Sequence, residues 1–522
     1  MGAAFLSCYS IVKQTATHAD TLAALGAADM FRHLEPRIVE LEDRFEIQLP
    51  RGLKVSDVDI VDPGFSYLQR PGKRPCNLPP ERTIEISSGD RSAEGDPDRM
   101  YRILSRMKAY GGPNKVVTQF ARLPRAEWSR RIWDCVNGGT RFLPSSPLVQ
   151  LFNPQSARGY ALLKPSGTNR RDKTKDTWGI SFLEWLRYRG YFEGAAGWFT
   201  AGDLRLYCPI PADIRFDHLA AAASSLRSLR LGGSAVKMDC RAVLALTRIL
   251  IEFAPHYRRP AESVRSIWVT HYKDMGQAHT VMASEQLALP NWFDLRSERQ
   301  ATLWLRTIEE HDTVLRRLTD THSEEFALLK QYRRTFQART DDSIQEFVSF
   351  LSEYGQLLFR LRTQDQWTLP QFKLETVTPI LRRDTRLRNL LRGRGFRAVA
   401  AAIRASTMAA QARRNQGLLD FREVRYGLLA ELRRAGSTGR EALMQRIAAF
   451  IGEYNAETAR RLSRGVPALR ILDNEWEEFK SRMEALPGQI TSAGMLVALA
   501  ACIPEASVSR VPEAEEERVL TA

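Results

Sequence analysis

Hydrophobic and polar residues follow two different periods along this chain, and the change between them divides it into two parts. In the first part, short alternating segments stand between helical ones; Phe45, Ile47 and Leu49, for example, alternate with polar residues. After about Trp292 the apolar residues recur only with the period of a helix. The pattern therefore predicts an α+β fold, with a mixed α/β N-terminal domain or domains followed by an all-α helical bundle.

The first part is expected to mix helices and strands. Its expected helices are residues 20–36, 99–109, 115–136, 180–189, 214–230 and 241–254. Its expected strands are two within residues 37–52, two from residue 148 onward, one at 203–209, and a hairpin of 264–274 and 278–284 turned at Met275 and Gly276. Residues 71–98, which are rich in proline, glycine and charge, are expected to form a loop or linker.

The second part is expected to contain only helices, separated by short glycine- or proline-containing breaks. These helices are residues 296–318, 322–337, 341–362, 372–391, 394–415, 421–435, 438–459 and 470–485. We expect four regions: an α+β region at 1–290, connecting helices at 291–340, a helical bundle at 341–510 and an acidic tail at 511–522.

Charge and composition narrow the class of partner. The 522 residues include 76 lysines and arginines against 61 acidic residues, which gives a net charge of +15. This excess favours nucleic acid, or less directly an anionic membrane surface. No apolar run approaches the roughly 20 residues of a spanning helix, and no signal peptide is expected. The six cysteines include no CxxC pair, so we expect neither a zinc ribbon nor a disulfide framework, and a cytoplasmic location.

Arginine is concentrated in residues 382–440, which hold fifteen arginines, four acidic residues and no lysine. The apolar residues there keep the helical period, so one face of each helix can pack while the other presents guanidinium groups. A guanidinium suits phosphate, whereas an ordinary solvated helix surface normally mixes both charges and favours lysine and glutamate. The candidates for contact with a nucleic-acid backbone are Arg382, Arg383, Arg386, Arg388, Arg392, Arg394, Arg397, Arg404, Arg413 and Arg414.

A second basic segment, residues 153–175, follows a turn and carries side chains of the types that pair with base edges. A solvated polar loop has a similar composition, so both interpretations stay open at this point. The candidates for reading a duplex are Asn153, Gln155, Ser156, Arg158, Lys164, Asn169, Arg170, Arg171, Lys173 and Lys175.

The motifs predict no catalytic residue. The sequence GTNRRDKT at 167–174 is similar to a phosphate-binding loop, but Asp172 stands where the second glycine is required. His271 and His279 flank the expected hairpin turn without a third close ligand, which is more typical of packed histidines. Neither GxSxG nor HExxH occurs. We therefore expect a protein that is not an enzyme and that uses no metal and no cofactor.

Several of these features together resemble the large subunit of type I CRISPR Cascade complexes, the Cas-eight family. They are the early DTLAALGAADMFRHL helix, the central LFNPQSARGYALLKPSG segment, the α+β first part and the helical second part. The second part also resembles the small subunit of such complexes, through YGQLLFRLR, FRAVAAAIRAST, VRYGLLAELRRAG and FIGEYN. The resemblance spans most of the chain.

The resemblance implies a non-catalytic subunit of an RNA-guided DNA surveillance complex. Members of this family bind at the 5′ end of the guide RNA, recognise the protospacer-adjacent motif in target double-stranded DNA, and help to open the DNA and hold the displaced strand of the R-loop. The implied partners are guide RNA, target DNA, the backbone and 5′-handle-binding subunits, the small subunit and a recruited helicase–nuclease, with no membrane. Residues 153–175 would then read the duplex, and the arginine helices would follow a strand backbone.

Two other classes of function are kept as alternatives. One is a nucleic-acid-processing enzyme, such as a metal-dependent nuclease, which metal-dependent DNA cleavage by the purified chain would reveal. The other is a free-standing DNA-binding regulator, which would bind a specific duplex without guide RNA.

Overall fold

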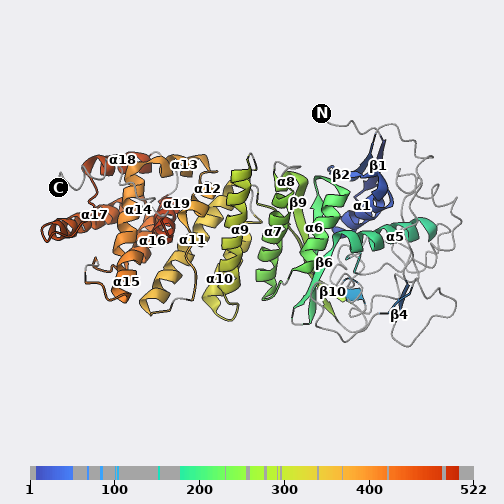
Figure 1. The fold of residues 1–522 in the computed structure, drawn as a ribbon, viewed down its shortest axis with the longest axis horizontal. Coiled ribbons are helices and arrows are strands. Elements are labelled where there is room, and N and C mark those ends of the chain that lie inside the picture. Colours follow the sequence, from blue (N-terminus) through green and yellow to red (C-terminus); the bar gives the residue numbers. More distant parts are fainter. Residues whose placement is uncertain are drawn as a thin grey trace. The chain divides into compact units, whose positions relative to one another are not determined.

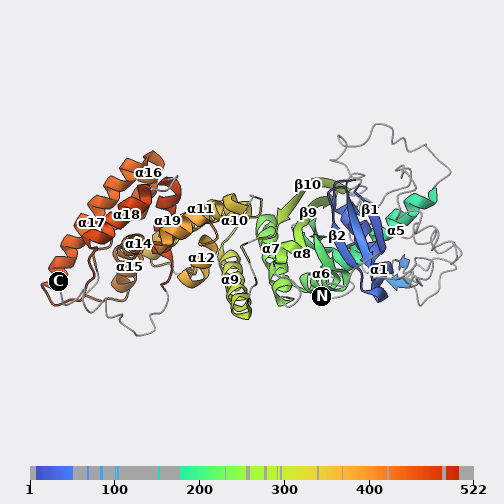
Figure 2. The same cartoon turned by 90° about the horizontal axis from the view of Figure 1, so that it is seen from above.

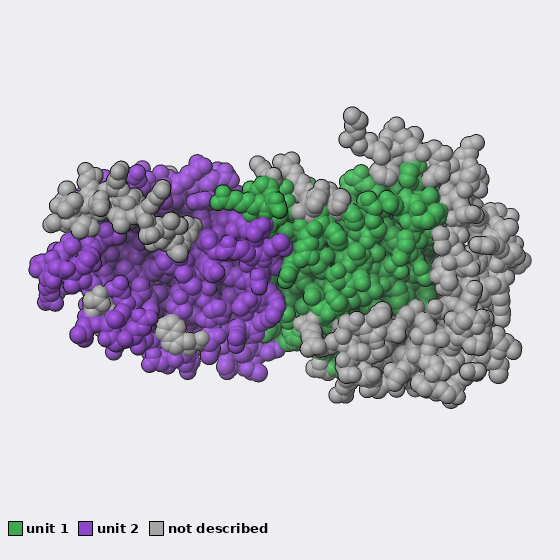
Figure 3. All heavy atoms as spheres, viewed as in Figure 1, with its two compact units in different colours: residues 1–301 green, residues 302–522 purple. Residues whose placement is uncertain are grey.

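A computed structural model describes most of the chain outside residues 51–176. The described ranges are 7–13, 15–50, 177–200, 202–229, 231–253, 259–274, 279–290, 297–337, 340–366, 368–419, 422–484 and 489–504, with shorter pieces between 67 and 154 and at 292–295. The chain divides into two units, residues 1–301 and 302–522 (Figure 3). The expected fold class is confirmed, since the first unit combines antiparallel sheets with helices and the described part of the second is helical.

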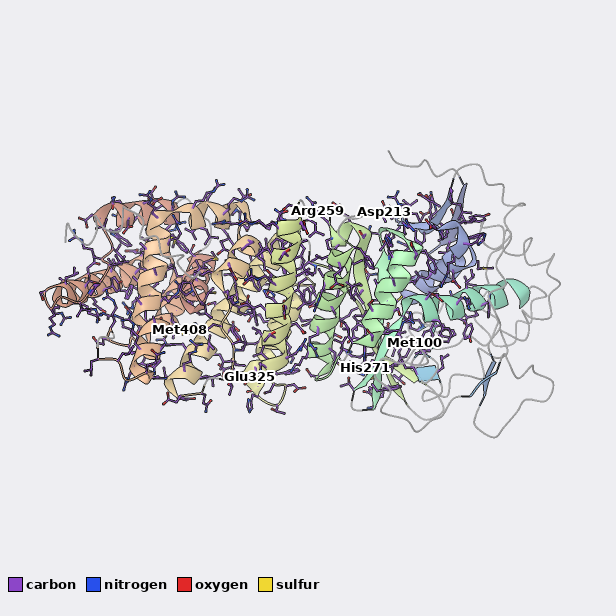
Figure 4. The ribbon with its side chains drawn as sticks, in the orientation of Figure 1. Met100, Asp213, Arg259, His271, Glu325 and Met408 are labelled. Carbon is purple, nitrogen blue, oxygen red and sulfur yellow. The ribbon has the colours of Figure 1, made fainter. Side chains whose placement is uncertain are left out.

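The first sheet has the strand order β1–β3–β2–β8, and every neighbouring pair is antiparallel. Its strands are β1 (Ser7–Val12), β2 (Arg37–Glu40), β3 (Arg44–Leu49) and β8 (Asp213–Arg215). The two strands expected within residues 37–52 are thus confirmed, and β3 buries alternate side chains as the pattern predicts. Strand β8 comes from far along the chain, and an ion pair between Arg37 of β2 and Asp213 of β8 joins the two strands. Asp213 is labelled in Figure 4.

The second sheet has the order β10–β9–β7–β6 and is also antiparallel. Its strands are β6 (Ala196–Thr200), β7 (Asp203–Pro211), β9 (Val264–Asp274) and β10 (His279–Ala288). The expected hairpin is confirmed as β9 and β10, and the expected strand at 203–209 is confirmed as β7. Strand β6 is not predicted by the pattern, because glycine and alanine interrupt its alternation.

Two short strands correct the prediction for residues 71–98. Strands β4 (Tyr67–Gln69) and β5 (Thr83–Glu85) pair in parallel, so the expected loop or linker is wrong for β5. The Thr-Ile-Glu sequence of β5 contains two β-branched residues, which favour an extended backbone. Most of the helices expected at 99–109 and 115–136 lies outside the described residues.

Helix α1 (His18–Met30) starts and ends earlier than the expected helix at 20–36. Thr17 is its N-cap and accepts a hydrogen bond from the backbone N–H of Ala19 at 3.2 Å. The Asp20 carboxylate accepts hydrogen bonds from the N–H groups of Thr15 and Ala16. Asp20 therefore stands at the third helical position and holds the chain before the cap, and it is not the N-cap itself.

Helix α1 crosses α5 (Thr177–Gly194) at two glycines (Figure 1). All thirteen residues of α1 are buried. A Cβ atom added at Gly26 would lie 1.9 Å from the Leu186 carbonyl oxygen, and one added at Gly190 would lie 1.9 Å from that of Leu22. The two backbones are therefore in direct contact, and neither position has room for a side chain.

Three more helices complete the described part of the first unit: α6 (Phe216–Ser228), α7 (Ala235–Glu252) and α8 (Pro260–Ser263). Helix α7 begins before the expected helix at 241–254, because Ser234 caps it. Buried Asp239 on α7 accepts hydrogen bonds from Arg205 and from the Tyr207 hydroxyl, each at 2.9 Å. This paired buried charge fixes α7 against β7.

The second unit begins within α9 (Glu298–Arg317) and continues as a series of helices. They are α10 (Ser323–Arg334), α11 (Thr340–Thr363), α12 (Leu374–Leu381), α13 (Thr385–Arg392), α14 (Arg394–Ser406), α15 (Met408–Asn415), α16 (Leu428–Thr438), α17 (Arg440–Leu462), α18 (Asp473–Glu484) and α19 (Gln489–Ala501). Met408, at the start of α15, is marked in Figure 4.

Three expected helices of this unit have different limits in the structure. The helix at 372–391 is divided into α12 and α13, because Asp384 caps α13 by accepting hydrogen bonds from two N–H groups of its first turn. The helix at 394–415 is divided into α14 and α15 at Thr407, whose φ of −125° and ψ of −94° are not helical. The helix at 421–435 begins only with α16.

Helix α19 is a core helix that the periodicity does not predict, because its residues 493–501 are all apolar. All its residues from Ser492 to Ala501 are buried. It packs against α11, α14 and α16 (Figure 2). A Cβ atom added at Gly355 of α11 would lie 2.7 Å from the Cβ atom of Ala501, so α11 and α19 also approach closely.

A buried histidine lies in the aromatic core of α9, α10 and α11. The His311 ring centroid is 5.2 Å from that of Phe347 and 5.1 Å from that of Phe372, and its Nδ1 lies 2.7 Å from the Tyr332 hydroxyl. Burial lowers the pKa of His311 from 6.5 to about 3. The imidazole is therefore neutral in the folded protein near pH 7.

Acidification is expected to destabilise the second unit through His311. Because its folded pKa lies below the unfolded one, the unfolded chain binds more protons, and stability present above about pH 6.5 is lost as the pH falls towards 3. This loss amounts to about 1.4 kcal/mol per pH unit below the unfolded pKa. Urea unfolding at several pH values between 7 and about 5, where most carboxylates stay ionised, measures this loss of stability. Limited proteolysis in parallel shows which unfolding transition belongs to the second unit. In His311→Gln the free energy of unfolding should depend less on pH. An equal slope of this free energy against pH in both proteins would contradict the role given to His311.

Candidate nucleic-acid interface

The ten duplex-reading candidates all lie outside the described residues, so their role stays a prediction. They are Asn153, Gln155, Ser156, Arg158, Lys164, Asn169, Arg170, Arg171, Lys173 and Lys175.

The residues just before this segment are buried and hydrogen-bonded. Leu151 and Phe152 form a turn, where the sequence predicts a strand. The Leu151 carbonyl oxygen accepts a hydrogen bond from the Tyr272 hydroxyl at 3.1 Å and lies 3.1 Å from Nε2 of His18. Burial lowers the pKa of His18 from 6.5 to about 4, so its neutral ring donates from Nε2 and accepts at Nδ1 from Thr270, 3.0 Å away. These contacts fix the Leu151 backbone to α1 and β9.

We use the name arginine face for five exposed arginines on three consecutive helices. They lie at the end of α12, along α13 and in the first turn of α14, and they are Arg382, Arg386, Arg392, Arg394 and Arg397. In the part of the chain that the structure describes, none of the five forms an ion pair with an acidic residue. Their positive charge is therefore available to a ligand in solution.

Packing on the opposite side of these helices turns the arginines outward. Helix α13 buries Leu387, Leu390 and Leu391. Helix α14 approaches α18 so closely that a Cβ atom added at Gly395 would lie 1.9 Å from the Glu475 carbonyl oxygen. Because one side of each helix packs in the core, the guanidinium groups lie on the solvent side, as expected for amphipathic helices.

Glu478 of α18 contacts the start of α14 and already has partners. Glu478 accepts a hydrogen bond from the backbone N–H of Gly395 at 3.0 Å and one from Nε of Arg482 at 2.9 Å. The Gly395 N–H, followed by the Arg482 side chain, lowers the pKa of Glu478. Its negative charge thus serves the start of α14 and Arg482, and it forms no ion pair with the arginine face.

The other five backbone candidates differ in their surroundings. Arg383 is half-buried, and Arg388 donates a hydrogen bond to the Arg382 carbonyl oxygen at 2.7 Å. Arg404 donates to the Leu499 carbonyl oxygen at 2.6 Å, and burial lowers its pKa, so it links α14 to α19. Arg413 and Arg414 are exposed in the last turn of α15.

Part of the positive charge in residues 382–440 is neutralised by acidic residues from other helices. Arg425 pairs with Glu453 and lies 3.6 Å from Glu457, both on α17, and Arg433 pairs with Glu353 of α11 at 3.1 Å. These glutamates lie outside the arginine-rich stretch, so counting acidic residues within it overstates the free charge. The five arginines of the arginine face form none of these pairs.

Tyr426 is an exposed aromatic residue beside Arg414 that the sequence does not single out. It was expected inside the helix at 421–435, where no signal separates it from a packing residue. In the structure it lies in the turn before α16 and half of its surface is exposed.

The described residues give no sign of a metal centre. No group of three or more His, Cys, Asp or Glu side chains among them could hold a metal ion. His271 (Figure 4) is opposite Ala283 in the hairpin and its Nε2 lies 2.9 Å from Asp203, so it does not face His279, which pairs with Asp274. Burial raises the pKa of the Cys502 thiol to about 12, which keeps it protonated.

No described helix has both the length and the apolar composition needed to cross a membrane. Neither a family model nor a curated protein sequence matches the chain. The function is therefore inferred from the residues themselves and from the arginine face in particular.

Proposed function

We propose that this chain is a non-catalytic, nucleic-acid-binding subunit of an RNA-guided DNA surveillance complex, the large subunit of a type I CRISPR Cascade. The observation that carries the proposal is the arginine face: five exposed guanidinium groups on consecutive helices, without acidic partners in the described part of the chain. A guanidinium binds phosphate through a fixed fork of donors, and a row of them suits a sugar–phosphate backbone.

The nature of this face favours binding that does not depend on base sequence. Contacts to phosphate fix the position of a nucleic acid but carry no sequence information, so a face made only of arginines suits the backbone of a guide, target or displaced strand. The sequence-reading role, recognition of the protospacer-adjacent motif, belongs in this proposal to residues 153–175. The partners are guide RNA, target double-stranded DNA, the other Cascade subunits and the recruited helicase–nuclease.

Salt dependence of binding tests the proposal on the purified full-length chain. If all five arginines of the face contact phosphates, the slope of log affinity against log salt is expected to reach about −3.5 to −4.5, at 0.7–0.9 per contact. Fluorescence anisotropy with labelled single strands and duplexes measures that slope, and a slope near zero would contradict the proposal. Co-expression with the neighbouring genes should in addition yield a complex that retains a guide RNA, as RNA-guided recognition requires.

A further inference from the structure

We propose that Arg414 and Tyr426 together bind an unpaired nucleobase of a single-stranded nucleic acid. This inference rests on the proposed function and deepens it by naming a base-binding site on elements other than those of the arginine face. The site is built from the last turn of α15 and from the turn that precedes α16.

The end of α15 holds the arginine side of the site. Gly417 has a φ of +71°, a left-handed conformation that glycine adopts without strain. Its N–H donates to the Arg414 carbonyl oxygen at 2.9 Å, and the N–H of Leu418 donates to that of Arg413 at 3.1 Å. These two bonds form a Schellman motif, which closes the helix and fixes the backbone of both arginines.

Three contacts fix the turn that carries Tyr426. The N–H of Arg425 donates to the Ser406 carbonyl oxygen at 2.8 Å, and its guanidinium pairs with Glu453 on α17. The Tyr426 ring stacks on Phe359 of α11, with centroids 6.4 Å apart and planes 26° apart. Phe359 is 4% exposed whereas Tyr426 is 50% exposed, so a buried ring supports an accessible one.

The two side chains are joined in a single arrangement. The Arg414 guanidinium donates a hydrogen bond to the Tyr426 hydroxyl, and its central carbon lies 5.9 Å from the ring centroid. An aromatic ring and a guanidinium plane are the two groups on which proteins stack unpaired bases, whatever their identity. Because Arg414 and Tyr426 are already held in place, few additional side chains have to become ordered when a base binds.

The surroundings favour a strand with accessible bases over a duplex. Bases within a duplex are stacked on one another, so their faces are not accessible to a side chain. Arg413 adds positive charge for the phosphates, and Leu418 and Leu419 provide exposed apolar surface of 43% and 100% beside it. Basic groups next to aromatic and apolar ones are typical of surfaces that bind single strands.

Paired strands with and without bases test the site. The full-length chain is titrated with a labelled oligothymidylate and with an abasic deoxyribose–phosphate strand of equal length. Tyr426→Ala is expected to weaken oligothymidylate binding about 5- to 150-fold, the range for loss of one stacked base, and to leave the abasic strand unaffected. Tyr426→Phe retains the ring and loses only the hydrogen bond from Arg414, so it should weaken oligothymidylate binding much less than Tyr426→Ala does.

Leu469→Ala is the matched control, since Leu469 is an exposed apolar residue of similar exposure, 44%. Leu469→Ala should change the affinity neither for oligothymidylate nor for the abasic strand. Equal weakening of both strands by Tyr426→Ala would overturn the site, because the effect would then not involve a base. No change with either strand would also overturn it and would leave the surface to a protein partner. Salt-dependent binding of the abasic strand tests the proposed function separately from the base-binding site. If the chain binds neither strand, both the site and the proposed function are overturned.

Discussion

Gly190→Val is expected to destabilise the first unit by about 3 kcal/mol or more, at or beyond the upper end of the range for overpacked sites. The Cβ atom alone would lie 1.9 Å from a backbone oxygen of α1, and backbone cannot swing aside as a flexible side chain does. Helix α1 is buried along its whole length, so moving it away from α5 would disturb most of the core of this unit. Because domains are stable by only about 5–15 kcal/mol, a loss of this size should leave α1 open to protease.

Gly452 provides the control for this substitution. It lies on α17 with no atom within 4 Å of an added Cβ, so Gly452→Ala is expected to be neutral or to stabilise by about 0.5–1 kcal/mol. Combining Gly26→Ala with Gly190→Ala should cost less than the sum of the two, since helices already moved apart by one substitution accommodate the other. Limited proteolysis followed by mass spectrometry shows directly whether the protease cleaves within residues 18–30. A Gly190→Val protein in which these residues resist protease as before would contradict the contact.

Reversing three arginines of the face is expected to lower nucleic-acid affinity on the order of 100-fold at moderate salt. The change is Arg386→Glu, Arg392→Glu and Arg397→Glu, made together in the full-length chain. If each arginine neutralises one phosphate, the log–log salt slope should become shallower by about 2 to 3. The loss should be the same for all sequences, because phosphate contacts do not read bases. Anisotropy titrations at several salt concentrations give both quantities.

A second triple variant carries the same change in net charge at other positions. Arg306, Arg316 and Arg360 are exposed arginines of the same unit, each paired with an acidic residue: Glu375, Asp312 and Glu324. Exposed pairs of this kind contribute about 0–1 kcal/mol each, so their reversal to glutamate should leave the unit folded. It should also lower affinity much less than reversal of the arginine face. Equal loss in both variants would mean that net charge, and not this face, determines binding.

Regular periodicity was sufficient to predict much of the fold. The β9–β10 hairpin and strands β2 and β3 follow from the alternation of apolar and polar residues, and in β3 alternate side chains are buried. Residues 493–501 of helix α19 are all apolar, so this part of the sequence carries no helical period to detect. The break between α14 and α15 is equally invisible, since Thr407 leaves the helical conformation within a sequence that could continue as one helix.

The candidate site was predictable in composition but not in detail. The excess of arginine is evident from the sequence, and the spacing of Leu387, Leu390 and Leu391 indicates which side of α13 is buried. Which arginines are free depends on partners distant in sequence, as with Glu353 for Arg433 and Leu499 for Arg404. The exposure of Tyr426 depends likewise on tertiary contacts that hold its turn out of a helix.

The place of α19 in the core has a consequence for biosynthesis. Helices α11, α14 and α16 all pack against α19, which follows them in the chain, so they cannot complete their packing until it has emerged from the ribosome. At about 5–20 residues per second, translation from the end of α11 to the end of α19 takes roughly 7 to 28 s. Throughout that time the apolar surface of α11 around Gly355 lacks its cover. The nascent second unit is therefore expected to be a chaperone client until translation has passed α19.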